Sequence, residues 1–161
     1  MKLKRLLGVL ALSLAVVTLA ACGQKSTESI IKNELKDSYT GYSENSGYDS
    51  LLFSGGGQEI IFDKSNHKLK SGDEEAYYEV VPEDELTKNM KGILNSHEND
   101  LAGKDYFIIN VGYQKDSIWG KFGDQLYCVV LTDGGKKIRI FEFETGYTDD
   151  GYYDFSGTAD E

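Results

Sequence analysis

The sequence predicts an α+β fold, in which antiparallel strands before and after one amphipathic helix form a sheet and the helix packs on it. Short runs of alternating polar and apolar residues, separated by turn-forming residues, fill the segments 51–81 and 106–145. The segment 82–97 instead spaces its apolar residues for an α-helix. About eight strands would also be enough for a closed, lipocalin-like β-barrel. A helix in the middle of the chain counts against that alternative.

The N-terminal segment 1–21 is typical of a secretory signal peptide. Lys2, Lys4 and Arg5 precede a long apolar run, which ends in small residues. This run falls short of the roughly 20 apolar residues that span a bilayer, which argues against an uncleaved transmembrane anchor. Its end, Ala20-Ala21-Cys22, does not supply the A-x-A pattern of ordinary signal cleavage.

The tetrapeptide Leu19-Ala20-Ala21-Cys22 resembles the lipobox of bacterial lipoproteins. In that family a diacylglyceryl group is attached to the cysteine thiol, and the preceding peptide bond is cut. The resemblance implies that Cys22 is lipidated and that the exported chain is anchored by this lipid to the outer face of the cytoplasmic membrane. Because Cys128 is then the only cysteine and no intramolecular disulfide can form, the chain looks like a Gram-positive surface lipoprotein.

The chain is acidic, with 17 Lys and Arg residues against 27 Asp and Glu residues and a net charge of −10. Cleavage after residue 21 would remove Lys2, Lys4 and Arg5 and no acid. This charge argues against nucleic acid as a partner, since phosphates bind clusters of Lys and Arg. It also argues against electrostatic binding to anionic lipid, so membrane association would depend on the lipid anchor alone.

The chain after the signal peptide divides into a lipidated tether, 22–29, and one globular α+β domain, 30–161. Ser26 or Thr27 is expected to cap a first helix. The segment 38–50, rich in Gly, Ser and Asn, predicts a loop. The acidic C-terminal tail of the domain is expected to be frayed.

The first strand run, up to Val81, is predicted to form a meander of about four short strands. Its triple glycine, 55–57, lacks the lysine of a phosphate-binding loop and predicts a hairpin turn. Pro82 then opens the clearest helix, with acidic residues in the first turn, where the helix dipole favours them. The apolar stripe that must bury against the sheet is Leu86, Met90, Ile93, Leu94 and His97.

The second strand run begins with 106–113, which alternates as a half-buried strand does. The segment 125–132 is apolar on both faces and predicts a central strand, in which Cys128 is a buried, inert thiol. Asp133-Gly134-Gly135 predicts a tight hairpin. In 136–145 the apolar residues change parity, which indicates a bulge or an edge that is covered on both faces.

Tyrosine is the most unusual feature of the composition, with 11 residues beside a single tryptophan. Its ring and hydroxyl suit recognition surfaces, although tyrosine also favours strands for its own sake. A binding surface of exposed aromatic and acidic side chains is therefore a hypothesis. Its candidate residues are Trp119, Tyr147, Asp149, Asp150, Tyr152, Tyr153 and Asp154.

Sequence motifs for other chemistry are weak. The acids around Gly151 do not follow the EF-hand pattern, and His67 and His97 are isolated from other metal-ligand types, so no metal and no cofactor are expected. The G-x-S-x-G motif of serine nucleophiles does not occur, and no catalytic residue is predicted.

These observations predict a non-catalytic binding or interaction lipoprotein, whose partner is a cell-wall component, a small ligand or a protein. One alternative is a small-ligand carrier with a lipocalin-like barrel. Another is a small cell-envelope hydrolase that uses paired carboxylates, which meet only in three dimensions.

Overall fold

The computed structural model describes residues 25–45, 47–115, 125–143 and 153–161. The helices are α1 (Thr27–Asn33), the 3-10 turn η1 (Glu83–Glu85), α2 (Lys88–Ser96) and α3 (Glu98–Leu101). The strands are β1 (Ser38–Ser43), β2 (Asp49–Ser50), β3 (Phe53–Ser54), β4 (Gly56–Asp63), β5 (Lys68–Ser71), β6 (Glu74–Val81), β7 (Asp105–Gly112), β8 (Gln125–Thr132), β9 (Lys137–Glu142) and β10 (Asp154–Ala159).

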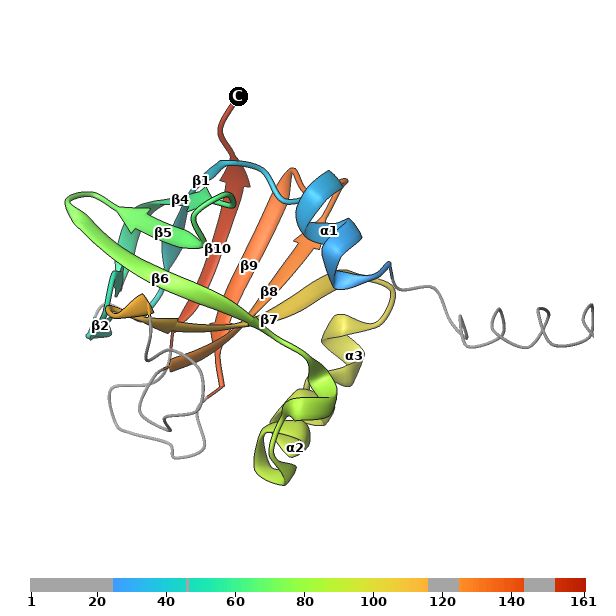
Figure 1. Ribbon diagram of the computed structural model, residues 1–161. Helices are drawn as coiled ribbons and strands as arrows, with labels where there is room; N and C mark the ends of the chain where they lie inside the picture. The colour runs from blue at the N-terminus through green and yellow to red at the C-terminus, as the bar shows by residue number, and fades with distance from the viewer. Residues whose placement is uncertain (1–24, 46, 116–124, 144–152) are drawn as a thin grey trace, which may run out of the picture.

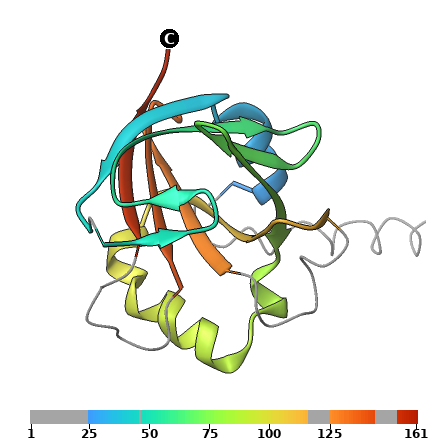
Figure 2. The same cartoon turned by 90° about the vertical axis from the view of Figure 1, so that its left-hand side faces the viewer.

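Eight of these strands form one closed antiparallel barrel, in the order β1-β10-β9-β8-β7-β6-β5-β4 (Figure 1). The barrel closes because β1 pairs with β4 on one side and with β10 on the other. Closure leaves the eight strands without a free edge. The strands β2 and β3 form a separate hairpin, which lies across one opening of the barrel in Figure 2.

The antiparallel sheet and the packed helix are confirmed, but the two-run α+β arrangement is wrong, and the closed barrel fits the alternative. The two strands that close it were expected as a loop and as a frayed tail. Both are poor in large apolar residues: Tyr39 is the one buried aromatic of β1, and Phe155 that of β10. The predicted loop 38–50 therefore begins with a strand, and the acidic tail contains another.

The barrel interior holds one cluster of buried side chains in which aromatic rings pack against one another. The ring of Phe53, from the β2–β3 hairpin, lies 4.4 Å from that of Tyr127 and 4.8 Å from that of Tyr153. Ile30 and Leu35, from α1 and the residues after it, belong to the same cluster. Since β1 runs from α1 towards the β2–β3 hairpin, these two elements cover opposite ends of the barrel.

A second apolar cluster lies outside the barrel, where α2 and α3 cover β7, β8 and β9 (Figure 1). The predicted stripe is confirmed, since Leu86 and Leu94 are buried and Met90 and Ile93 pack on the cluster. Pro82 precedes the 3-10 turn η1 rather than α2. The helix itself begins after Thr87, whose Oγ1 accepts a hydrogen bond from the backbone N–H of Met90 at 3.4 Å.

The parity change in 136–145 marks neither a bulge nor an edge, since β9 pairs in continuous register with β8 and β10, and its cause lies in these two clusters. Ile138 and Ile140 point into the barrel, whereas Phe141 and Phe143 point outwards and are covered by the helical layer. Both faces of this strand are thus buried near its C-terminal end. His97 belongs to the same layer, since its ring lies 4.4 Å from that of Phe141.

Candidate functional site

The structure describes two of the residues predicted for the aromatic and acidic binding surface. Tyr153 is fully buried in the barrel and its hydroxyl donates to Oε1 of Gln58 at 2.8 Å, so the prediction of an exposed ring is wrong at this position. Asp154 is bound to Arg139 on the outer face. The other predicted residues lie outside the described part of the chain: Cys22, Trp119, Tyr147, Asp149, Asp150 and Tyr152.

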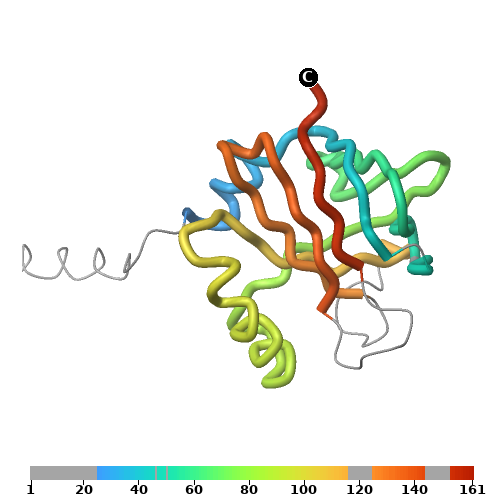
Figure 3. The backbone as a smooth tube through the Cα atoms, turned by 180° about the vertical axis from the view of Figure 1, so that it is seen from behind, coloured from blue at the N-terminus to red at the C-terminus, as the bar shows by residue number. Residues whose placement is uncertain are grey.

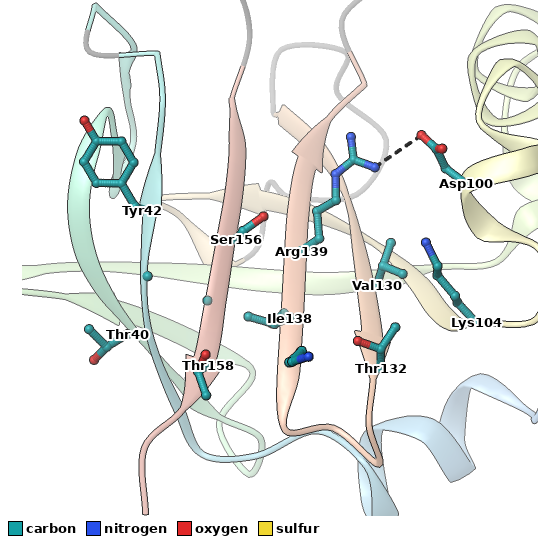
Figure 4. Close-up of a pocket in the computed structure, with 13 residues that line it drawn as sticks. Thr40, Tyr42, Asp100, Lys104, Val130, Thr132, Ile138, Arg139, Ser156 and Thr158 are labelled. Atoms are coloured by element: carbon teal, nitrogen blue, oxygen red, sulfur yellow. Dashed lines mark hydrogen bonds and ion pairs between the residues drawn. The ribbon is translucent and has the colours of Figure 1, made fainter.

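An open groove of about 480 Å³ lies on the outer face of the barrel (Figure 4). The strands beneath it, β1, β10, β9 and β8, lie side by side in the sheet (Figure 3). The floor of the groove consists of two rows of outward side chains that the strand register brings side by side. We name this surface the outer groove. The first row is Tyr42, Ser156, Arg139 and Val130, and the second row is Thr40, Thr158, Lys137 and Thr132.

The two ends of the outer groove differ in chemistry. Tyr42 stands at one end, with 56% of its surface exposed. At the other end Asp100, on α3, and Lys104, just after it, form a wall beside β8 (Figure 4). Between the ends lie short hydroxyl side chains, among them Ser156 and Thr158. Because these side chains are short, they line the groove without filling it.

Glycine keeps Tyr42 accessible on its β4 side. The register places Gly57 opposite Tyr42, and Gly57 contributes no side chain to the outer face. An added Cβ on Gly57 would have no heavy atom closer than the carbonyl oxygen of Gly41, at 4.0 Å. The tyrosine ring therefore has open space on the side of β4. On its other side lies Ser156, on the neighbouring strand β10.

Arg139 is the fixed charge of the groove. Its Nε and Nη2 donate to the two carboxylate oxygens of Asp154 at 2.8 and 2.7 Å, and its Nη1 donates to Oδ2 of Asp100 at 3.4 Å. The guanidinium also lies 4.9 Å from the centre of the Phe141 ring. These contacts raise the pKa of Arg139 and lower that of Asp100. Among the described residues, three of the five guanidinium N–H groups have acceptors, which leaves two for a ligand.

A second polar cluster lies inside the barrel, beneath the β2–β3 hairpin. The hydroxyls of Tyr48 and Tyr127 are 2.9 Å apart, and Tyr127 donates to Oε1 of Gln125. Gln58 donates from Nε2 to the carbonyl oxygen of Leu52 at 2.7 Å. Burial raises the pKa of Tyr127 far above its usual value, so its hydroxyl stays protonated and acts as a hydrogen-bonding group that holds the hairpin in place.

The remaining candidate groups have structural surroundings. Cys128 is fully buried under the helical layer, and burial raises the pKa of its thiol well above the usual range, which agrees with an inert thiol. The ring of His67 stacks on that of Tyr78. Within the described residues, no three His, Cys, Asp or Glu side chains are grouped to hold a metal ion.

Comparison with known proteins assigns no family. No family model, no curated protein and no solved structure matches the chain. In the described part of the chain, no helix is both long and apolar enough to cross a membrane.

The outer groove was missed by sequence reasoning because its two halves come from opposite ends of the domain. Alternation of polar residues is visible in β9, where Lys137 and Arg139 flank Ile138. The hydroxyl side chains that complete both rows belong to β10 and β1, and only the strand order of the barrel places them beside β9. Ser156 and Thr158 lie in the segment that was expected to be frayed.

Proposed function

We propose that the protein is a lipid-anchored, non-catalytic binding module at the outer face of the cytoplasmic membrane, and that its ligand lies in the outer groove. The observation that carries this proposal is the pair of side-chain rows across β1, β10, β9 and β8. They combine an exposed aromatic ring, a line of hydroxyls and a fixed guanidinium in one concave surface. Such a combination of an apolar surface and a few oriented polar groups is typical of binding sites.

The start of the domain supports close attachment to a membrane. Nζ of Lys25 lies 2.8 Å from Oε1 of Glu34 and 2.9 Å from Oδ2 of Asp105. Only Gly23 and Gln24 separate this residue from Cys22. An extended chain covers at most about 3.5 Å per residue, so a lipid on Cys22 would hold Lys25 within roughly 10 Å of the bilayer surface.

The same contacts orient the outer groove. Lys104, at one wall of the groove, directly precedes Asp105, which binds Lys25. In Figure 4 Lys104 lies on the side of α1, and Tyr42 lies at the far end. The anchored domain would therefore present the outer groove sideways, with Lys104 near the membrane and Tyr42 further from it.

Lipidation is tested by changing its acceptor. Cys22→Ser should leave the signal peptide uncleaved or the protein without a lipid, because only a thiol forms the thioether. The mass of the purified full chain and its partition into detergent measure both outcomes. Fully processed, lipid-bearing protein from the Cys22→Ser variant would contradict the anchor, and Cys128→Ser serves as the control that must still be processed.

Binding in the outer groove is tested with two tyrosines of similar exposure. Tyr42 and Tyr113 are 56% and 52% exposed, and Tyr113 does not line the groove. We expect the full chain in detergent to sediment with insoluble cell-wall material. Tyr42→Ala should weaken that binding about tenfold, since the loss of an aromatic contact often costs about 1–2 kcal/mol. Tyr113→Ala should bind as the unchanged protein does. Equal binding by both variants would exclude the groove as the site.

The barrel topology alone would suit a carrier of a small apolar ligand, but the interior contacts favour the outer face. Rings from the hairpin, from β8, and from β10 and the residue before it pack across the interior, with neighbouring ring centres 4.4–6.2 Å apart. A ligand inside would have to displace them.

The hydrolase alternative needs a carboxylic acid that stays protonated, whereas Arg139 lowers the pKa of Asp100 in the groove.

A further inference from the structure

We infer that the ligand of the outer groove is a sugar chain that carries carboxylates, an inference that rests on the proposed function. The first reason is local charge. Although the chain has a net charge of −10, the groove is lined by Lys104, Lys137 and Arg139 and by a single acid, Asp100. Two more acids, Asp154 and Asp133, border the groove as partners of Arg139 and Lys137. The outer groove is therefore close to neutral in an acidic protein, and an approaching anionic group meets little repulsion there.

The second reason is that two of these cations are available. Lys104 is exposed and makes no ion pair within the described structure. Lys137 lies 3.1 Å from Asp133, but both side chains are at least 60% exposed, and water and salt screen such a surface pair so that it holds Lys137 only weakly. Arg139 is neutralised by its acids and contributes orientation, through its two remaining N–H groups, more than charge.

The third reason is the floor between the charges. Thr40, Ser156 and Thr158 are exposed and each offers a hydroxyl that both donates and accepts. Neighbouring strands are about 4.8 Å apart, so Tyr42 on β1 and Arg139 on β9 are separated by about 10 Å. A ligand that reaches both must extend beyond a single small ring. Its hydroxyl groups would match those of the floor.

Tyr42 distinguishes a sugar chain from other anionic chains. A pyranose ring has a flat C–H face that packs on an aromatic ring, whereas a polyol phosphate has no ring to place there. A nucleic acid would bring a dense row of phosphates to a chain of net negative charge, with only two uncommitted lysines to receive them. One carboxylate on a sugar unit fits a groove with few, separated cations.

The test measures binding of the full chain, in non-ionic detergent, to oligogalacturonate and to the same oligomers after their carboxyl groups are reduced to alcohols. We expect the acidic oligomers to bind at least tenfold more tightly than the reduced ones. Lys104→Ala and Lys137→Ala should each weaken binding several-fold, while Lys88→Ala, an exposed lysine on α2 outside the groove, should not. Hyaluronan oligosaccharides are the second acidic probe, with different sugar stereochemistry.

Three results would overturn the inference. The first is equal binding of acidic and reduced oligomers, and the second is binding of neither acidic probe. The third is tighter binding of poly(glycerol phosphate) or polyuridylate. In each of these cases Tyr42-dependent sedimentation with cell-wall material would show that the groove still binds and that only the ligand class is wrong. Sedimentation that does not depend on Tyr42 would instead exclude the outer groove as the binding site.

Discussion

Gly41→Ala is expected to destabilise the barrel by about 3 kcal/mol or more, at the upper end of the effects of overpacking. A Cβ on Gly41 would lie 2.2 Å from the backbone oxygen of Ser156 and 2.6 Å from Cζ of Phe155. Phe155 lies over the glycine pair Gly41 and Gly157, which face each other across β1 and β10. The side chain could turn away, but the Ser156 backbone can move only if the two strands separate.

The measurement is the unfolding midpoint of the full chain in detergent, with Gly57→Ala as the matched control. Gly57 lies on the adjacent strand β4, and a Cβ there meets nothing closer than 4.0 Å. We expect Gly41→Ala to lower the melting temperature by about 10 °C. Gly57→Ala should change the unfolding free energy by at most about 1 kcal/mol, in the stabilising direction. Similar midpoints for both variants would show that the β1–β10 seam is not tightly packed.

The seam between β1 and β10 is also the part of the fold that the sequence did not predict. Hydrophobic period identified the strands whose inward residues are Ile, Val, Leu and Phe, such as β7 and β8, because each alternate position contributes to the core. In β1 and β10 the inward positions include Gly41 and Gly157, which have no side chains. The ring of Phe155, on β10, fills the space over both of them. Local pattern cannot reveal that Phe155 fills the space over two glycines on different strands.

The prediction of the helix succeeded for the opposite reason. Leu86 and Leu94 are spaced along one short segment, and their burial requires only that some apolar surface lies beneath them. That surface is the outside of the barrel, which the sequence hinted at through the parity change between Ile140 and Phe141. A helix in mid-chain is therefore compatible with a closed barrel, because it packs outside the sheet and leaves the strand order uninterrupted.

The candidate site was less accessible to sequence reasoning than the fold. Clusters of Tyr and Asp directed attention to the segment around Tyr153, yet the described member of that tyrosine cluster points into the barrel. Tyr42, which the sequence placed in a loop, is the exposed ring of the groove. Exposure depends on which face of a strand a residue occupies, and that face is defined only after its neighbours in the sheet are known.

Gly135→Ala is expected to release α1 from the end of the barrel. Gly135 has a φ of +80° in the turn between β8 and β9, and a Cβ there would lie 1.7 Å from the backbone oxygen of Glu34 and 2.6 Å from its carbonyl carbon. The turn and the helix end are also joined by Tyr39, whose hydroxyl donates to the carbonyl oxygen of Gly135 at 2.9 Å. The backbone of the turn cannot move away from Glu34 while this hydrogen bond is kept.

Gly72→Ala is the control that separates the effect of the contact with Glu34 from the effect of backbone strain. Gly72 has a φ of +56° in the β5–β6 turn and has open space around it, so both variants incur the cost of about 1–2 kcal/mol for a left-handed alanine. Only Gly135→Ala adds the clash, and we expect it to be destabilised by about 2 kcal/mol more than Gly72→Ala. Hydrogen exchange should then be faster in α1 for the Gly135 variant alone. Unchanged exchange in α1 would show that the helix is held at the end of the barrel without this contact.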